Sequence, residues 1–305
     1  MATDLKTEKI ALSTGVTLNV AHGGSGDPII FLHGFPESHR TWRHQLAALS
    51  SKFQVVAPDQ RGFAYSDKPR GVKNYAAAKI VDDVMALADA LGIRHFTLVG
   101  HDWGGAVAWL AALSHPMRIR RLVIVNAPHP LIFQKSLIED EAQREASQYI
   151  NVLRMPFAHV GMKAMGLEKL FEKMLASHAD TSRLTPNDRQ NYLDEWAQPR
   201  ALQTMVNWYR ASKVKVPKPG AKARLPLWTR GPFPKIAMPT LVIWGLKDKA
   251  LLPVQLAGLD RLVEDLRIVI SQEAGHFVTW EQPELVTEAI RDFIADTPEA
   301  SPGRP

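Results

Sequence analysis

Short apolar runs and amphipathic stretches alternate along the first 125 residues of the chain. Segments 8–12 and 16–22 alternate apolar and polar positions, which predicts a hairpin at the start of a sheet. Four further strands are predicted where fully apolar runs occur, at residues 29–32, 53–57, 96–99 and 122–125. Helices are predicted over residues 76–91 and 104–114. Because fully apolar strands need burial on both faces, this order indicates a parallel sheet with helices on both sides.

The alternation stops after residue 125 and resumes near residue 240. Strands are predicted at 240–244 and 266–270, and helices at 254–263 and 284–295. The intervening residues carry no strand signal, and Thr185-Pro186 and Gln198-Pro199 are typical of helix starts. We expect an α/β core from residues 1–129 and 235–298, a helical cap from 130–234 after the sixth strand, and a disordered tail at 299–305.

Composition narrows the class without changing this architecture. The 305 residues are 46% hydrophobic and 22% charged, which suits a globular enzyme with a large core. The net charge of +6 comes largely from residues 210–235, which hold eight Lys or Arg and no acidic residue. We interpret this run as a solvated, proline-interrupted loop and expect no nucleic-acid partner. The start of the sequence lacks the apolar core of a signal peptide, and the longest apolar run covers only residues 106–113. We therefore expect a soluble, cytoplasmic protein with no membrane span.

One segment carries the pattern of a catalytic turn. Residues 98–106 are predicted to form a strand, a sharp turn and the start of a helix, with Asp102 at the centre and glycines two positions before and after it. A nucleophile elbow needs this pattern, because only small neighbours let the strand and the helix approach each other. Without partners, the same string is also typical of a glycine-rich turn whose Asp caps a helix.

The partners of a nucleophile follow in the order of an α/β-hydrolase triad. Asp248 comes after one predicted strand and His276 after the next, so both lie at strand ends where such sheets hold their sites. The N–H groups of Phe35 and Trp103 are placed to form an oxyanion hole. His33 and His101 abut strand ends, and we expect them to make structural hydrogen bonds. The sequence has no cysteine, which excludes a thiol nucleophile and thiolate metal sites.

With these residues the chain resembles the α/β-hydrolase superfamily and, more narrowly, the soluble epoxide hydrolases. The matching strings are HGFPES at residues 33–38, DQRG at 59–62 and GHDWGG at 100–105. The resemblance implies an α/β-hydrolase fold, a mostly parallel eight-stranded sheet with a helical lid. It also implies two lid tyrosines that hold the epoxide oxygen: Tyr209, and Tyr149 as the best candidate for the first. Tyr192 is the only other tyrosine of the lid region.

The resemblance implies that Asp102 opens the epoxide and becomes an ester, which His276, oriented by Asp248, hydrolyses with water. The expected partners are a small apolar epoxide and water, with no cofactor or metal, in a monomer or homodimer. Haloalkane dehalogenases share the nucleophile and remain an alternative. Phe35 argues against them, because it offers no side-chain donor to a halide, and Trp103 stands where fluoroacetate dehalogenases carry Arg. A catalytically inactive binding protein would show a broken triad, and an esterase would need Ser in place of Asp102.

Overall fold

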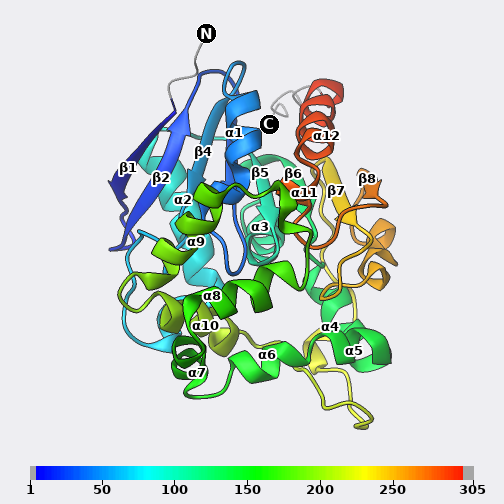
Figure 1. Ribbon diagram of the computed structural model, residues 1–305. Helices are drawn as coiled ribbons and strands as arrows, with labels where there is room; N and C mark the ends of the chain where they lie inside the picture. Colours follow the sequence, from blue (N-terminus) through cyan, green and yellow to red (C-terminus); the bar gives the residue numbers. More distant parts are fainter. Residues whose placement is uncertain (1–4, 298–305) are drawn as a thin grey trace.

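The computed structural model describes residues 5–297, so the tail predicted at 299–305 lies outside the described residues. Its centre is one eight-stranded sheet in the order β1-β2-β4-β3-β5-β6-β7-β8 (Figure 1). The strands are β1 Lys6–Ala11, β2 Thr17–Gly23, β3 Pro28–Leu32, β4 Gln54–Pro58, β5 Phe96–His101, β6 Ile119–Val125, β7 Thr240–Gly245 and β8 Leu266–Ser271. β2 is antiparallel to both β1 and β4, and the remaining pairs are parallel. The predicted eight-stranded, mostly parallel sheet is confirmed.

Alternate residues of each central strand enter two separate cores. Ile29 and Phe31 of β3 pack with one group of helices, while Ile30 and Leu32 pack with the other. The first group is α1 Arg43–Leu49, α11 Val278–Glu281 and α12 Pro283–Asp296; the second includes α2 Ala77–Ala90 and α3 Trp103–Ser114. The sheet is therefore buried on both faces, which is why its strands are apolar without alternation.

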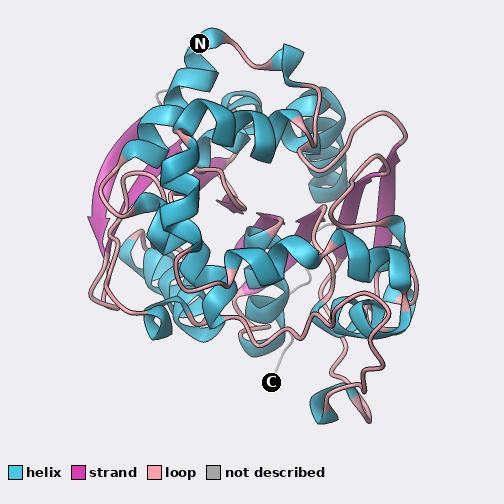
Figure 2. Cartoon of the chain, turned by 60° about the horizontal axis from the view of Figure 1, so that its bottom comes forward, coloured by secondary structure: helices cyan, strands magenta, loops and turns pink. Residues whose placement is uncertain are grey.

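All α-helices between β6 and β7 belong to one long insertion. They are α4 Pro130–Glu139, α5 Glu141–Ala146, α6 Gln148–Leu153, α7 Ala158–Met165, α8 Leu167–Phe171, α9 Pro186–Ala197 and α10 Ala201–Ala211. Figure 1 shows them below the strands, and Figure 2, with that side turned forward, shows helices framing the strand ends. Within residues 5–297, no helix combines the length and apolar character that crossing a bilayer requires.

Two predicted helix details are wrong and one is confirmed. Residues 254–263 form two 3-10 turns, Pro253–Leu256 and Leu259–Arg261, because Gly258 between them has φ +82° and interrupts any helix. Gln198-Pro199 does not start a helix: Gln198 ends α9, and α10 begins after Arg200, whose φ is +66°. Thr185 does cap α9, in a reciprocal capping box with Asp188.

Candidate active site

Asp102 occupies a strained turn between β5 and α3. Its φ is +50°, a conformation that a non-glycine residue adopts only where the surroundings impose it. The surroundings here are backbone atoms at close range. A Cβ added to Gly100 would lie 2.4 Å from the carbonyl oxygen of Gly104, and one on Gly104 would lie 2.2 Å from that of Leu32. The glycines that predicted an elbow are therefore needed for strand and helix to approach.

Three side chains from three strand ends meet at this turn. Nδ1 of His276 lies 2.7 Å from Oδ2 of Asp248, and its Nε2 lies 3.6 Å from Oδ2 of Asp102. Asp248 and His276 are buried. The structure thus places His276 between the candidate acid, to which it is hydrogen-bonded, and the candidate nucleophile, although Asp102 and His276 are 174 residues apart in the chain.

Asp248 is held by more donors than His276 alone. Oδ1 accepts the backbone N–H groups of Ala250 at 2.8 Å and Leu251 at 2.9 Å, and Oδ2 accepts Nδ2 of Asn126 at 2.8 Å. Asn126 also accepts the N–H of Gly245 at 2.8 Å. Sequence reasoning missed Asn126, although its place directly after β6, at the same edge of the sheet, is a signal that could have found it.

The electrostatics of this group favour an ion pair. Burial lowers the pKa of His276, but the charge and hydrogen bond of Asp248 and the charge of Asp102 outweigh it and raise the pKa to about 9. Burial raises the pKa of Asp248, but His276, the N–H of Leu251 and Asn126 bring it below its ordinary value. His276 is therefore an imidazolium at neutral pH, paired with the ionised carboxylate of Asp248.

The predicted oxyanion donors flank Asp102. The N–H of Phe35 donates to Oδ1 of Asp102 at 2.7 Å. Gly34 makes this approach feasible, because a Cβ there would lie 2.4 Å from the Asp102 side chain. Trp103 is the first residue of α3, so its N–H has no carbonyl one turn earlier to bond. Oδ1 is thus held by the backbone, and Oδ2 is the oxygen that faces His276.

Tyr149 of α6 and Tyr209 of α10 approach each other over Asp102. Their ring centroids are 6.0 Å apart in an edge-to-face arrangement, and Tyr209 packs edge-on against Phe35 and Trp103, each at 5.1 Å. Burial and the nearby charge of Asp102 raise the pKa of both hydroxyls far above the ordinary value. Both are therefore protonated donors at any ordinary pH.

Tyr192 does not share this position. It is buried on α9, and its hydroxyl donates to Oε1 of Glu37 at 2.7 Å. Tyr192 is absent from the residues that line the two cavities at Asp102. Of the two candidates for the first tyrosine, Tyr149 is the one that the fold brings to Asp102.

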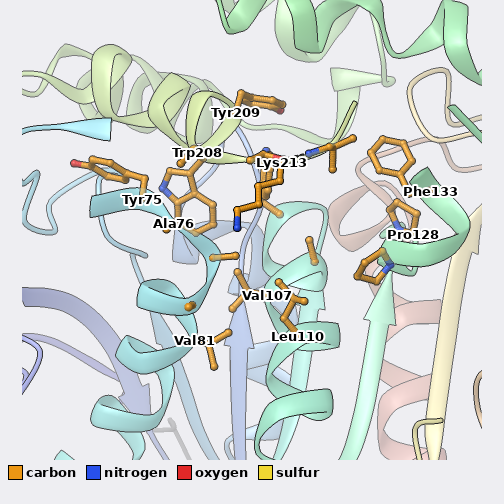
Figure 3. Close-up of a pocket in the computed structure, with 18 of the residues that line it drawn as sticks. Tyr75, Ala76, Val81, Val107, Leu110, Pro128, Phe133, Trp208, Tyr209 and Lys213 are labelled. Carbon is orange, nitrogen blue, oxygen red and sulfur yellow. Dashed lines mark hydrogen bonds between the residues drawn. The ribbon is translucent and has the colours of Figure 1, made fainter. Parts of the chain in front are cut away.

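Two cavities meet at Asp102, Tyr149 and Tyr209. The first, about 680 Å³, runs between α2, α3 and α10, with Val81, Val107 and Leu110 below and Trp208 above (Figure 3). The second, about 810 Å³, contains His276. Its other lining side chains are mainly apolar and include Leu153, Met155, Phe157, Met162, Met165, Leu170, Met174 and Phe277. A substrate bound at Asp102 therefore has apolar space on either side.

The other two histidines of the motifs make structural hydrogen bonds, as predicted. His33 accepts the N–H of Gln60 at 2.9 Å, and burial lowers the pKa of its ring to about 4. Nε2 of His101 donates to the carbonyl of His276 at 2.8 Å, and its Nδ1 faces Oε2 of Glu37 at 3.3 Å. Sequence reasoning also missed the buried Glu37 as a partner of these side chains, although its place in the HGFPES string was a signal that could have found it.

In the part of the chain that the structure describes, no three His, Cys, Asp or Glu side chains are arranged to hold a metal ion. The groups around Asp102 are carboxylate, imidazole, phenol and backbone N–H. Such a set can attack carbon, activate water and donate hydrogen bonds to a developing oxyanion.

Comparison with known proteins gives a consistent picture. The α/β-hydrolase fold family model matches residues 27–283. Human epoxide hydrolase 4 is 32% identical over 285 residues, covering 91% of this chain and 75% of the relative. A solved structure of an epoxide hydrolase from hot-environment metagenomes is 44% identical with a TM-score of 0.88, covering 95% of this chain and 98% of that one. The Bacillus megaterium epoxide hydrolase crystallised with an inhibitor is 29% identical with a TM-score of 0.85, covering 94% and 100%.

Proposed function

The chain belongs to the epoxide hydrolase family of the α/β-hydrolase superfamily, and we propose that it converts an epoxide and water into a vicinal diol through an ester on Asp102. The observation that carries this proposal is the opposition of Asp102 and the two tyrosines. A carboxylate oxygen lies in the same cavities as two phenol side chains, so one substrate can meet a nucleophile and two acids together.

In the first step Oδ2 of Asp102 attacks a ring carbon, and the carbon–oxygen bond of the epoxide breaks. Tyr149 and Tyr209 donate hydrogen bonds to the ring oxygen, and one of them supplies the proton that the alkoxide takes up. Their raised pKa values support this role, because a phenol that is already ionised has no proton to donate. Oδ1 stays on the Phe35 N–H and becomes the ester carbonyl oxygen.

In the second step water attacks the ester carbonyl carbon, and His276 takes the proton. Esterification neutralises Asp102, whose charge helps to raise the pKa of His276. The pKa of His276 therefore falls when the ester forms. The imidazolium then gives its proton, through water, to the tyrosinate left by the first step, and the neutral imidazole can act as a base. The N–H groups of Phe35 and Trp103 stabilise the negative charge on Oδ1, and the diol leaves with the former Oδ2 of Asp102.

We propose that residues 130–234 act as a cap over the core formed by 1–129 and 235–298. Tyr149 and Tyr209, which lie on α6 and α10 of this segment, support the division. The apolar lining of both cavities supports aryl or alkyl epoxides as substrates.

A single turnover in heavy-oxygen water tests the covalent step. The first diol should carry light oxygen from Asp102, with the label entering the enzyme. Label in that first diol would mean direct attack by water and would exclude the ester. A panel of epoxides and haloalkanes, read for diol and halide together, tests the substrate class. Halide release without diol formation would favour the dehalogenase alternative.

A further inference from the structure

Exposed apolar side chains gather at the mouth of the second cavity. Ten large apolar residues are exposed in the described chain, and four of them, Val152, Met155, Phe157 and Val160, fall within nine residues of one another. Phe157 is 75% exposed and, with Val152 and Met155, also lines the cavity that contains His276. We call these four residues the apolar rim. Apolar groups concentrated on a surface beside a cavity mark a site that contacts a partner or a membrane.

A basic segment lies directly beside the rim. Three side chains of the α6 region bind the backbone of residues 214–217: Arg154 donates to the carbonyl of Val214 at 2.7 Å, Asn151 to that of Val216 at 3.1 Å, and Gln148 to that of Pro217 at 2.9 Å. These bonds hold the exposed Lys215 and Lys218, the basic strap, along α6. The neighbouring Lys213 lines the first cavity instead (Figure 3). Figure 1 shows α6, α7 and the loop after α10 together at the end of the molecule farthest from the N-terminus.

The two segments that form the rim and the strap carry basic residues and no acidic ones. Residues 146–167, which contain the rim, and 210–235, which contain the strap, hold no acidic residue. No described acidic side chain lies within ion-pair distance of the two strap lysines. In the helical segment that follows the rim, Glu168 and Glu172 are both paired with Arg189. Near the strap, Glu141 accepts the N–H of Gly220. Two lysines that pair with no described acidic side chain thus border the apolar rim.

We propose that the apolar rim and the basic strap dock this protein on anionic lipid bilayers, with the mouth of the second cavity facing the hydrocarbon. Apolar side chains that insert at the interface, flanked by lysines that meet anionic headgroups, are the combination that binds such a surface. A second copy of the chain fits less well, because a two-fold interface through this patch would bring two basic straps together. Docking would let an apolar substrate pass from the bilayer to Asp102, a consequence that rests on the proposed function.

The test is co-sedimentation of the full chain with vesicles, measured without any substrate. Vesicles of phosphatidylcholine mixed with phosphatidylglycerol should bind the protein at low salt, and raised salt should release it. Lys215→Gln with Lys218→Gln should weaken binding about 25-fold, since each lysine near an anionic surface changes partition roughly fivefold. Lys52→Gln with Lys79→Gln, which removes the same charge from exposed positions elsewhere, should bind as the wild type does.

A matched pair tests the apolar contribution. Phe157→Asp should abolish vesicle binding, whereas Met117→Asp, at a residue 84% exposed in the loop after α3, should leave it unchanged. Equal loss in both would mean that charge alone governs binding and would overturn the proposed rim. Failure of the wild-type chain to bind, or a wild-type dimer that Phe157→Asp dissociates, would overturn the docking proposal.

Activity assays separate this inference from the function itself. The Lys215 and Lys218 variant should hydrolyse a water-soluble epoxide at the wild-type rate, because neither lysine lines a cavity at Asp102. The same variant should be slower on a long-chain epoxide presented in anionic vesicles. Vesicle binding without diol formation from any epoxide would refute the function and leave the docking surface intact. Diol formation without vesicle binding would support the function and refute the docking surface.

Discussion

The two halves of the candidate site are held in different ways. The core half, with Asp102, Asp248 and His276, stands at strand ends and is tied by buried hydrogen bonds from Asn126, His101 and Phe35. The insertion half consists of two tyrosines on separate helices. Arg154 links those helices by donating to the carbonyls of Tyr209 at 2.9 Å and Ser212 at 3.2 Å.

This difference suggests a division of labour. In the proposed mechanism, attack and ester hydrolysis need groups fixed to within tenths of an ångström, and a sheet edge with backbone donors supplies that precision. Activation of the epoxide oxygen needs hydroxyl donors beside the nucleophile, and α6 and α10 supply them. Substitution of Asp248 or His276 should therefore stop turnover at the ester, whereas substitutions in the insertion half should slow its formation.

The largest effect is expected at His276. His276→Gln should lower turnover by about 10³-fold or more, because the ester forms but no base activates water. Mass spectrometry of the intact protein should then show an increase equal to the mass of the substrate. If the variant stays unmodified after incubation with an epoxide that the wild type hydrolyses, His276 is needed before the ester forms. That result would contradict the proposed division of labour.

The tyrosines should show the opposite defect. Tyr149→Phe and Tyr209→Phe should each slow ester formation about tenfold, and the double variant about 10²- to 10³-fold, since each keeps its ring packing and loses one donor. Rapid-mixing kinetics should show slower ester formation with ester hydrolysis unchanged. Tyr192→Phe, which loses only the bond to Glu37, is the matched control and should keep wild-type ester formation.

Stability against pH probes the ion pair of the core half. The folded-state pKa of His276, about 9, lies above its ordinary value of 6.5, so its charge stabilises the fold fully below pH 6.5. That contribution, roughly 3 kcal/mol, is lost as pH rises through 9. Urea titrations between pH 6.5 and 9.5 should show a steeper fall for the wild type than for His276→Gln. Parallel curves would mean that His276 is not charged in the folded protein.

The smallest effect concerns the contact between α9 and the core. Glu195 is buried and accepts hydrogen bonds from Ser38 and Arg40, both at 3.0 Å; burial and the charge of Asp59 raise its pKa to about 7. Its charged form is therefore disfavoured in the folded state. Relative to the wild type, Glu195→Gln should gain about 1 kcal/mol of stability as pH rises from 6 to 8. Measured activity toward a soluble epoxide should not change, and a gain that is independent of pH would contradict the assignment.

Local sequence was sufficient to predict the strands, the turn at Asp102 and the chain order of Asp102, Asp248 and His276. Each depends on short-range constraints: apolar runs must be buried, and the turn at Asp102 needs glycine at positions 100 and 104. Local pattern failed at residues 254–263, where the positive φ of Gly258 cannot be read from apolar spacing, and at α10, which begins two residues after Pro199.

Only the tertiary structure decided which long-range neighbours complete the site. Asn126 donates a hydrogen bond to Asp248, which is 122 residues away in the chain, and Tyr192 donates one to Glu37, which is 155 residues away. Tyr149 is therefore the tyrosine that lies with Tyr209 beside Asp102. The basic run 210–235 reads as a loop in the sequence, and its position beside the apolar rim depends on bonds from Gln148, Asn151 and Arg154. Such contacts arise from how helices pack over the sheet, and residue spacing carries no record of that packing.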